Sequence, residues 1–215
     1  MAISAKILLR RSQSFGWRGE DGRVRTMKRR LRAEFEERRV SRPFAARQRA
    51  ASDLAGWILS APFRLEYDVT VAAYVPFGSE PGSVALLDAL ADRGVTVLVP
   101  VVPAGEPTAL DWVRYDGSDS LARGRWGLLE PTGDHLGRDA IRAATVIFVP
   151  AYAVDKSGTR LGRGAGYYDR TLAGSTAETV AVIYDDELVE SLPAAPHDVR
   201  VGWALTPDGG FQQLG

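Results

Sequence analysis

The chain alternates between dense apolar runs and amphipathic segments over most of its length. Apolar runs rich in β-branched residues predict buried strands at 69–77, 95–103, 143–155 and 179–186, and two further runs predict strands at 110–115 and 199–207. Amphipathic spacing and flanking Pro and Gly residues predict helices at 80–94 and 166–173. This alternation predicts an α/β fold with a mostly parallel open sheet and helices on both faces, a Rossmann-like three-layer arrangement.

The chain before the first strand is predicted to form an N-terminal helical segment. From Met27 onward, Leu31 and Phe35 stand four residues apart among charged residues, which is the spacing of one helix face. A second helix is expected to begin at a Ser41 cap, with Pro43 in its first turn, and to end before Pro62.

The first 26 residues differ from the rest because they show little sustained periodicity. We expect residues 1–26 to be a loosely held extension, or to precede a functional start at Met27. Residues 27–215 are then expected to form a single domain.

Composition narrows the possible functions. The 215-residue chain contains no cysteine, which excludes disulfides, thiol nucleophiles and thiolate metal sites. No apolar run approaches the ~20 residues needed to cross a bilayer. We therefore expect a cytoplasmic protein that does not act at a membrane.

Charge is distributed unevenly although the net charge is zero. Residues 1–50 hold 15 Lys and Arg against 5 Asp and Glu, and the remainder holds 12 against 22. A basic N-terminal segment could meet nucleic acid, an anionic membrane or a polyphosphate ligand, or it could simply be a solvated helix face.

The segment "RLGRGAGYYDR", residues 160–170, carries candidate chemistry. Glycines at 162, 164 and 166 follow a predicted strand and precede a predicted helix, a placement that suits anion binding by backbone N–H groups. The segment is neither a Walker A motif nor a dinucleotide-binding fingerprint. A flexible connection, with Tyr167 and Tyr168 packed on the sheet, is the alternative.

The longer string "VDKSGTRLGRGAGYYDRTL" resembles the signature of the 5-formyltetrahydrofolate cyclo-ligase family, also called methenyltetrahydrofolate synthetases. Four other segments match this family in order and spacing: "KRRLR" at 28–32, "YVPFGSEPGS" at 74–83, "GRWGLLEPTG" at 124–133 and "PHDVRVGWALTP" at 196–207. The resemblance covers nearly everything from Met27 onward, whereas residues 1–26 have no counterpart.

The resemblance implies an ATP- and Mg²⁺-dependent ligase. Family members convert 5-formyltetrahydrofolate to 5,10-methenyltetrahydrofolate and release ADP and phosphate. Phosphorylation of the formyl oxygen produces a better leaving group, and N10 then closes the ring. Such a reaction depends on positioning and charge neutralisation rather than on a protein nucleophile. The implied partners are 5-formyltetrahydrofolate and MgATP, without nucleic acid or membrane, and we expect a monomer.

The same resemblance assigns residue roles. Arg163 and Lys28 are expected to be catalytic. The expected ATP contacts are Lys28, Arg32, Arg160, Leu161, Gly162, Arg163, Gly164, Ala165, Gly166, Tyr167 and Tyr168. The expected folate contacts are Val75, Glu80, Trp126, Arg163, Gly164, Ala165, Gly166 and Tyr167, and the expected Mg²⁺ ligands are Asp169 and Asp198.

Each assignment has a structural alternative. Lys28 and Arg32 could be helix-surface charges, Glu80 a helix-start acid, Asp198 a turn cap and Trp126 a core residue. Two positions depart from the usual family pattern. Ala165 replaces a frequent Gly or Lys, and Gly202 stands where many members have an aspartate.

Two other functions remain open from the residues themselves. A noncatalytic nucleotide- or sugar-phosphate-binding protein would keep the glycine-rich segment but have no use for Glu80. A nucleic-acid-binding protein would use the basic residues of 1–50, and its affinity would fall steeply with salt.

Overall fold

A seven-stranded sheet forms the centre of the molecule. The computed structural model describes residues 17–103, 105–124 and 129–215. The strand order is β12-β11-β9-β6-β1-β2-β3, in which the five inner strands run parallel and the two edge strands, β12 and β3, run antiparallel to their neighbours. The strands are β1 (Thr70–Ala73), β2 (Thr96–Val101), β3 (Asp111–Arg114), β6 (Ala144–Pro150), β9 (Glu178–Val182), β11 (Trp203–Thr206) and β12 (Gly210–Gln213). The predicted mostly parallel α/β sheet is confirmed.

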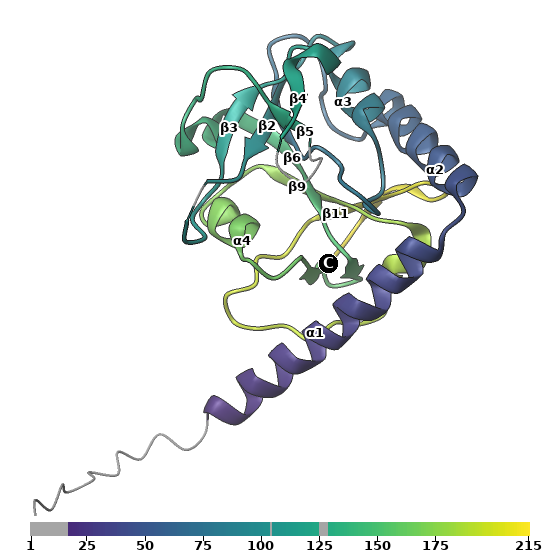
Figure 1. Ribbon diagram of the computed structural model, residues 1–215, viewed down its shortest axis with the longest axis vertical. Helices are drawn as coiled ribbons and strands as arrows, with labels where there is room; N and C mark the ends of the chain where they lie inside the picture. Colours follow the sequence, from purple (N-terminus) through teal and green to yellow (C-terminus); the bar gives the residue numbers. More distant parts are fainter. Residues whose placement is uncertain (1–16, 104, 125–128) are drawn as a thin grey trace, which may run out of the picture.

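Two apolar layers lie on opposite faces of this sheet because successive strand residues point to opposite sides. Val71 and Phe148 face α2 (Phe44–Gly56) and α3 (Val84–Ala91). Ala72 and Ile147 face α4 (Tyr167–Leu172) and the short 3₁₀ helix Arg138–Ala143. Figure 1 shows α2 and α3 side by side, with α4 on the other side of the sheet. The expectation of helices on both faces is confirmed.

The long helix α1 (Trp17–Ser41) packs against a small second sheet. This sheet joins β10 (Leu188–Val189), β7 (Ala153–Asp155) and β8 (Arg160–Leu161), in that order. Phe35 of α1 is buried in a cluster with Tyr152, Ala153 and Leu161, and Leu31 packs at its margin. Figure 1 shows α1 running along the lower side of the molecule, away from α3. The predicted apolar face of this helix is confirmed.

Several local predictions were wrong. Helix α1 begins at Trp17 rather than at Met27. Ser41 is the last residue of α1, where its Oγ donates to the Arg38 carbonyl at 2.8 Å. Helix α2 instead begins after Pro43, without a side-chain cap. A residue that precedes proline is disfavoured in the helical region, so the break falls at Arg42.

The predicted strand at 143–155 divides into two strands in different sheets. β6 ends at Pro150, which lacks a backbone donor. The chain then turns, and Tyr152 N–H bonds the Leu161 carbonyl at 2.8 Å to start the hairpin between β7 and β8. Sequence patterning also missed β12 and the separate hairpin of β4 (Leu121–Arg123) and β5 (Leu129–Pro131). Among the described residues, no helix combines the length and apolar composition needed to span a bilayer.

Candidate active site

The candidate residues gather beyond the carboxyl ends of the parallel strands. The Glu80 loop (residues 74–83) follows β1, and the glycine loop (residues 162–166) follows β8, which the chain reaches after β6. Helix α1 contributes the third part of the site. In sheets of this kind, ligands bind at this edge. The structure therefore brings these three parts together at the edge of the sheet where ligands of such folds bind.

Arg32 connects α1 to the glycine loop. Its Nε donates to the Gly162 carbonyl at 2.7 Å. A Cβ on Gly164 would lie 3.1 Å from the Arg32 guanidinium carbon, and Gly164 has a φ of +101°. Both close approach and backbone conformation therefore require glycine at 164. Burial lowers the pKa of Arg32, although Asp198, Tyr152 and Asp169 act in the opposite direction.

The three glycines are required for different reasons. Gly166 has a φ of +75° and precedes α4 as its N-cap. Gly162 is not among the positive-φ residues. A Cβ there would instead lie 2.6 Å from Arg160 Nη1. Gly162 therefore leaves room for the Arg160 side chain, whereas Gly164 and Gly166 supply positive φ.

Lys28 reaches Asp198 from the same face of α1 as Arg32. The Lys28 side chain is 11% exposed, and its Nζ forms an ion pair with Asp198 Oδ2. The Ala195 N–H donates to the same carboxylate oxygen at 2.6 Å. Lys28 and Arg32 are four residues apart on one helix face, so they project toward the same region. They are not ordinary helix-surface charges.

Arg160 points into the protein rather than toward open space. Its side chain is 4% exposed, and Nη2 donates to Asp169 Oδ1 at 3.0 Å. Nη1 donates to the Pro150 carbonyl at 3.2 Å. Leu161 is also buried, in the cluster beneath α1. In this arrangement Arg160 orients Asp169, and Leu161 presents only its backbone to the site.

Glu80 and Arg163 pair across the site. Arg163 Nε donates to Glu80 Oε1 at 2.8 Å, and Phe77 N–H donates to Glu80 Oε2 at 2.9 Å. The Glu80 side chain is 6% exposed, whereas that of Arg163 is 47% exposed. A sheltered carboxylate therefore faces a partly exposed cation. Val75, in the same loop, is half-buried against the apolar layer below.

The paired tyrosines combine packing with a possible site role. Tyr167 packs on one face of the sheet, and Tyr168 contacts both apolar layers. The buried Tyr168 hydroxyl has no hydrogen-bond partner among the described residues, and burial raises its pKa. Ala165 is exposed, and its carbonyl accepts from Arg170 Nη1 at 3.0 Å. The proposed packing of the tyrosines on the sheet is confirmed, and the unsatisfied hydroxyl could serve a ligand.

The possible metal ligands are carboxylates held by cations. Asp169 pairs with Arg160, and Asp198 pairs with Lys28. Within the part of the chain that the structure describes, no three metal-ligating side chains cluster together. Mg²⁺ bound to nucleotide commonly uses one or two carboxylates plus phosphate oxygens. The donor set therefore fits a nucleotide-bound Mg²⁺ better than a cage made of protein alone.

Sequence reasoning missed three residues that hold the site together. The Glu36 carboxylate accepts hydrogen bonds from the Tyr152 hydroxyl at 2.8 Å and from the Ser79 hydroxyl at 3.1 Å. Only the position of Glu36 beside buried Phe35 hinted at such a role.

Trp126, expected in the folate pocket, lies outside the described residues.

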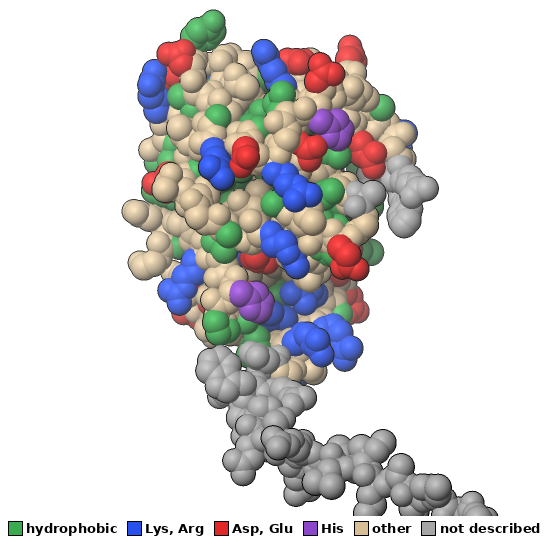
Figure 2. Space-filling model, turned by 90° about the vertical axis from the view of Figure 1, so that its left-hand side faces the viewer, with side chains coloured by type: hydrophobic (Ala, Val, Ile, Leu, Met, Phe, Trp, Pro, Cys, Tyr) green, Lys and Arg blue, Asp and Glu red, His purple; other side chains and the backbone are tan. Residues whose placement is uncertain are grey.

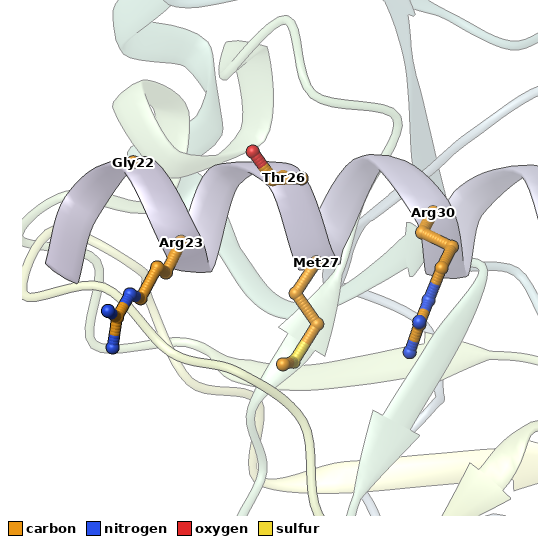
Figure 3. A pocket seen from close by; sticks show the side chains of 5 residues that line it. All are labelled: Gly22, Arg23, Thr26, Met27 and Arg30. Atoms are coloured by element: carbon orange, nitrogen blue, oxygen red, sulfur yellow. The ribbon is translucent and has the colours of Figure 1, made fainter. Parts of the chain in front are cut away.

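A cavity lies elsewhere on α1, apart from these contacts. It has a volume of about 500 Å³ and is lined by Gly22, Arg23, Thr26, Met27 and Arg30. Figure 3 shows the side chains of Arg23, Met27 and Arg30 pointing to the same side of the helix. None of these residues belongs to the contacts described above, so this cavity is separate from the candidate site.

Surface charge follows the uneven distribution along the sequence. On the face shown in Figure 2, Lys and Arg side chains are more frequent toward the lower end, near α1. Asp and Glu side chains are more frequent in the upper part of this face. On this face, positive charge is therefore concentrated at the end of the molecule that carries α1.

Comparison with known proteins identifies the family. A family model described as the 5-formyltetrahydrofolate cyclo-ligase family matches residues 24–207. The chain belongs to this family. It is 47% identical over 189 residues to the 5-formyltetrahydrofolate cyclo-ligase of Mycolicibacterium smegmatis, covering 86% of this chain and 95% of the relative. It is 30% identical over 141 residues to the Escherichia coli cyclo-ligase, covering 64% and 78%, respectively.

A solved structure supports the same relationship. The NMR structure of Aquifex aeolicus 5,10-methenyltetrahydrofolate synthetase matches with a TM-score of 0.72 and 26% identity. The match covers 87% of this chain and 93% of the Aquifex chain. The resemblance inferred from the sequence motifs is therefore confirmed, and the chain shares the cyclo-ligase fold.

Proposed function

We propose that this protein is an ATP-dependent ligase that converts 5-formyltetrahydrofolate to 5,10-methenyltetrahydrofolate, with release of ADP and phosphate. The observation that carries the proposal is that three groups of residues meet at one place in a chain of the cyclo-ligase family. The α1 cations, the glycine loop and the Glu80 loop meet at one edge of the sheet. This arrangement suits a reaction that must hold a polyphosphate beside a second substrate.

The reaction needs the formyl oxygen to become a leaving group. In the proposed sequence, that oxygen attacks the γ-phosphorus of ATP, and ADP departs. N10 then attacks the activated formyl carbon, a carbon–nitrogen bond forms, N10 loses its proton and phosphate leaves. Because charge develops mainly on phosphate oxygens, positioned cations supply most of the assistance that the protein gives.

Lys28, Arg32 and Arg163 are the proposed cations for the ATP phosphates. Arg32 is already fixed to the glycine loop by its bond to Gly162. Lys28 would exchange its ion pair with Asp198 for a phosphate oxygen. We propose that backbone N–H groups of the glycine loop also bind the ATP phosphates. Tyr167 and Tyr168, at the start of α4, are proposed to contact ATP beside this loop. Arg160 would act by orienting Asp169.

Glu80 is the proposed recognition residue for the pterin ring. A carboxylate can accept paired N–H donors from a 2-amino-4-oxo ring, and the Glu80 carboxylate is sheltered enough to favour such bonds. Arg163 now occupies one of its oxygens. Folate binding at Glu80 would therefore release Arg163 toward the transferred phosphoryl group. Val75 and Trp126 are proposed as apolar pocket residues.

Asp169 and Asp198 are the proposed Mg²⁺ ligands, together with phosphate oxygens of ATP. The ion would neutralise charge on the phosphates during transfer. Gly202 supplies no carboxylate at the position where many family members have an aspartate. These two aspartates and water would therefore complete the coordination. We further propose that the single catalytic domain spans residues 27–215 and acts as a monomer in the cytoplasm.

The decisive assay follows product formation by absorbance. Purified protein is mixed with 5-formyltetrahydrofolate and MgATP, and parallel reactions omit the folate, the ATP or the Mg²⁺. We expect methenyltetrahydrofolate only in the complete mixture. Folded protein that binds ATP but forms no product would favour the noncatalytic nucleotide-binding alternative.

A further inference from the structure

Glu36 links three elements around the candidate site. It belongs to α1 and accepts the hydroxyl of Tyr152, which stands between β6 and β7, at 2.8 Å. Its other carboxylate oxygen accepts the hydroxyl of Ser79 at 3.1 Å. Ser79 is 7% exposed and immediately precedes Glu80. A single side chain therefore ties the helix to the Glu80 loop and to the segment after the central strand.

The same arrangement surrounds Arg163. Its guanidinium carbon lies 5.9 Å from the centre of the Tyr152 ring and 5.6 Å from that of Phe77. These are distances at which an aromatic face attracts a cation. Tyr152 and Phe77 therefore bracket the arginine that pairs with Glu80.

Tyr152 is itself held from two sides. Its ring lies 4.9 Å from the guanidinium carbon of buried Arg39, and its hydroxyl bonds Glu36. Burial, followed by the bond to Glu36, raises the pKa of Tyr152, which keeps the hydroxyl protonated and able to donate. The ring presented to Arg163 has little freedom to turn.

We propose that Glu36, through Tyr152 and Ser79, is a positioning residue that sets the Glu80–Arg163 geometry and thereby the affinity for the folate substrate. The inference rests on the proposed function. Glu36 does not reach the reacting atoms in this account. It instead fixes the loop and the ring beside them, and its effect belongs to folate binding rather than to ATP binding.

Tyr152→Phe tests the link because it keeps the ring and removes the hydroxyl. We expect the KM for 5-formyltetrahydrofolate to rise about fivefold, a loss equivalent to one net hydrogen bond. The KM for ATP should stay within about twofold, and kcat should change less than the folate KM.

Glu36→Gln and the double variant Glu36→Gln/Tyr152→Phe complete a double-mutant cycle with Tyr152→Phe. If the two residues act as one unit, their effects on folate KM will not add. Glu34→Gln is the matched control. Glu34 lies on the same helix and pairs with Arg38 at the surface, where its side chain is 46% exposed. This control should leave both KM values unchanged.

The outcomes separate the inference from the proposed function. An active wild-type protein whose Tyr152→Phe and Glu36→Gln variants keep the wild-type folate KM would overturn the inference alone. Equal increases in both KM values, accompanied by a lower Tm, would also overturn it, because they would indicate general loosening. A folded wild-type protein without folate- and ATP-dependent turnover would overturn the proposed function and the inference together.

Discussion

Glu80 is the side chain on which the proposed recognition of the folate substrate depends. Its carboxylate is sheltered, and in this structure it accepts from the Phe77 N–H and from Arg163. The arginine is the more exposed partner and can move away, whereas the backbone donor is fixed by the turn. A pterin that replaced Arg163 would therefore meet a carboxylate that is already oriented.

We expect Glu80→Ala to raise the folate KM by about 10- to 100-fold, the range for losing hydrogen bonds to a charged acceptor. ATP affinity should remain near that of the wild type. Steady-state kinetics with each substrate varied, together with nucleotide titration, measure the two effects. Glu66→Ala is the control because Glu66 forms a surface ion pair with Arg64 and its side chain is 65% exposed. An equal loss of ATP affinity in Glu80→Ala would contradict this assignment.

The two arginines Arg160 and Arg163 show that sequence resemblance does not specify where a side chain points. The motif assigned Arg160 and Arg163 to the same segment and expected both to contact ATP. The Arg160 side chain is 4% exposed and binds Asp169, whereas Arg163 extends toward Glu80. Their roles differ because β8 ends at Leu161, so only the residues after it leave the sheet.

At the scale of elements, the contact between α1 and the glycine loop depends on the absence of a side chain at 164. We expect Gly164→Ala to weaken ATP binding about tenfold or more, because a Cβ would displace the Arg32 guanidinium and strain the backbone. Gly174→Ala is a matched control. Gly174 also has positive φ, at +77°, but a Cβ there would meet nothing within 4 Å.

Nucleotide titration and thermal unfolding of both glycine variants measure this difference. Backbone strain should lower the stability of each variant by about 1–2 kcal/mol. Only Gly164→Ala should lose ATP affinity. Similar ATP affinities in the two variants would show that the contact with Arg32 is unimportant.

The β7–β8 hairpin depends on Asp155. Burial opposes its charge, but the Ser157 hydroxyl and the backbone N–H groups of Leu192, Thr159 and Ser157 outweigh this and lower its pKa. Because this pKa is lowered in the folded protein, the ionised Asp155 stabilises the fold at pH values above the ordinary aspartate pKa of about 3.9. That stabilisation is lost as the pH falls through the folded-state pKa. The hairpin therefore becomes weaker in acid.

Asp155→Asn should lower the free energy of unfolding at pH 7 by about 1–3 kcal/mol. The difference from wild type should shrink as the pH falls below about 4. Urea unfolding across this pH range measures both effects. Asp139→Asn, at a side chain that is 85% exposed, should follow the wild-type curve. A constant difference at every pH would show that the charge of Asp155 is not responsible.

At the scale of the whole molecule, a buried ion pair fixes α1 against the sheet edge. Arg39 Nε and Nη2 donate to the two Glu187 carboxylate oxygens at 2.7 Å each, and both side chains are 1% exposed. Burial raises the pKa of Glu187 although Arg39 acts in the opposite direction. Glu187 follows β9, so this pair joins the N-terminal helix to the core.

Arg39→Met should lower the free energy of unfolding by about 3–5 kcal/mol because it leaves a buried carboxylate without its cation. The double variant Arg39→Met/Glu187→Leu should recover much of this loss. Arg38→Met, one residue earlier at a side chain that is 48% exposed, is the control. Urea unfolding provides the comparison, and an Arg39→Met loss as small as that of the control would refute the role of the pair.

The sequence predicted the element types well where patterning was strong. The five parallel strands have continuous apolar runs, and all of them are found. The predictions failed at boundaries, such as Ser41 and the division of 143–155, where prolines and the pairing of β7 with β8 decide the outcome. The β12 strand was missed because "GFQQ" gains its stability by pairing with β11 rather than from its own pattern.

By itself, the sequence determined the fold class, the family and the identity of most candidate residues, because strand periodicity and the "RLGRGAGYYD" motif are local properties of the chain. Only the tertiary structure decided which side chains meet. The sheet order and the position of α1 bring Glu36 to Tyr152 and Ser79, and bring Arg163 to Glu80. These partners are 43 to 116 residues apart, and their contacts depend on packing that no local pattern specifies.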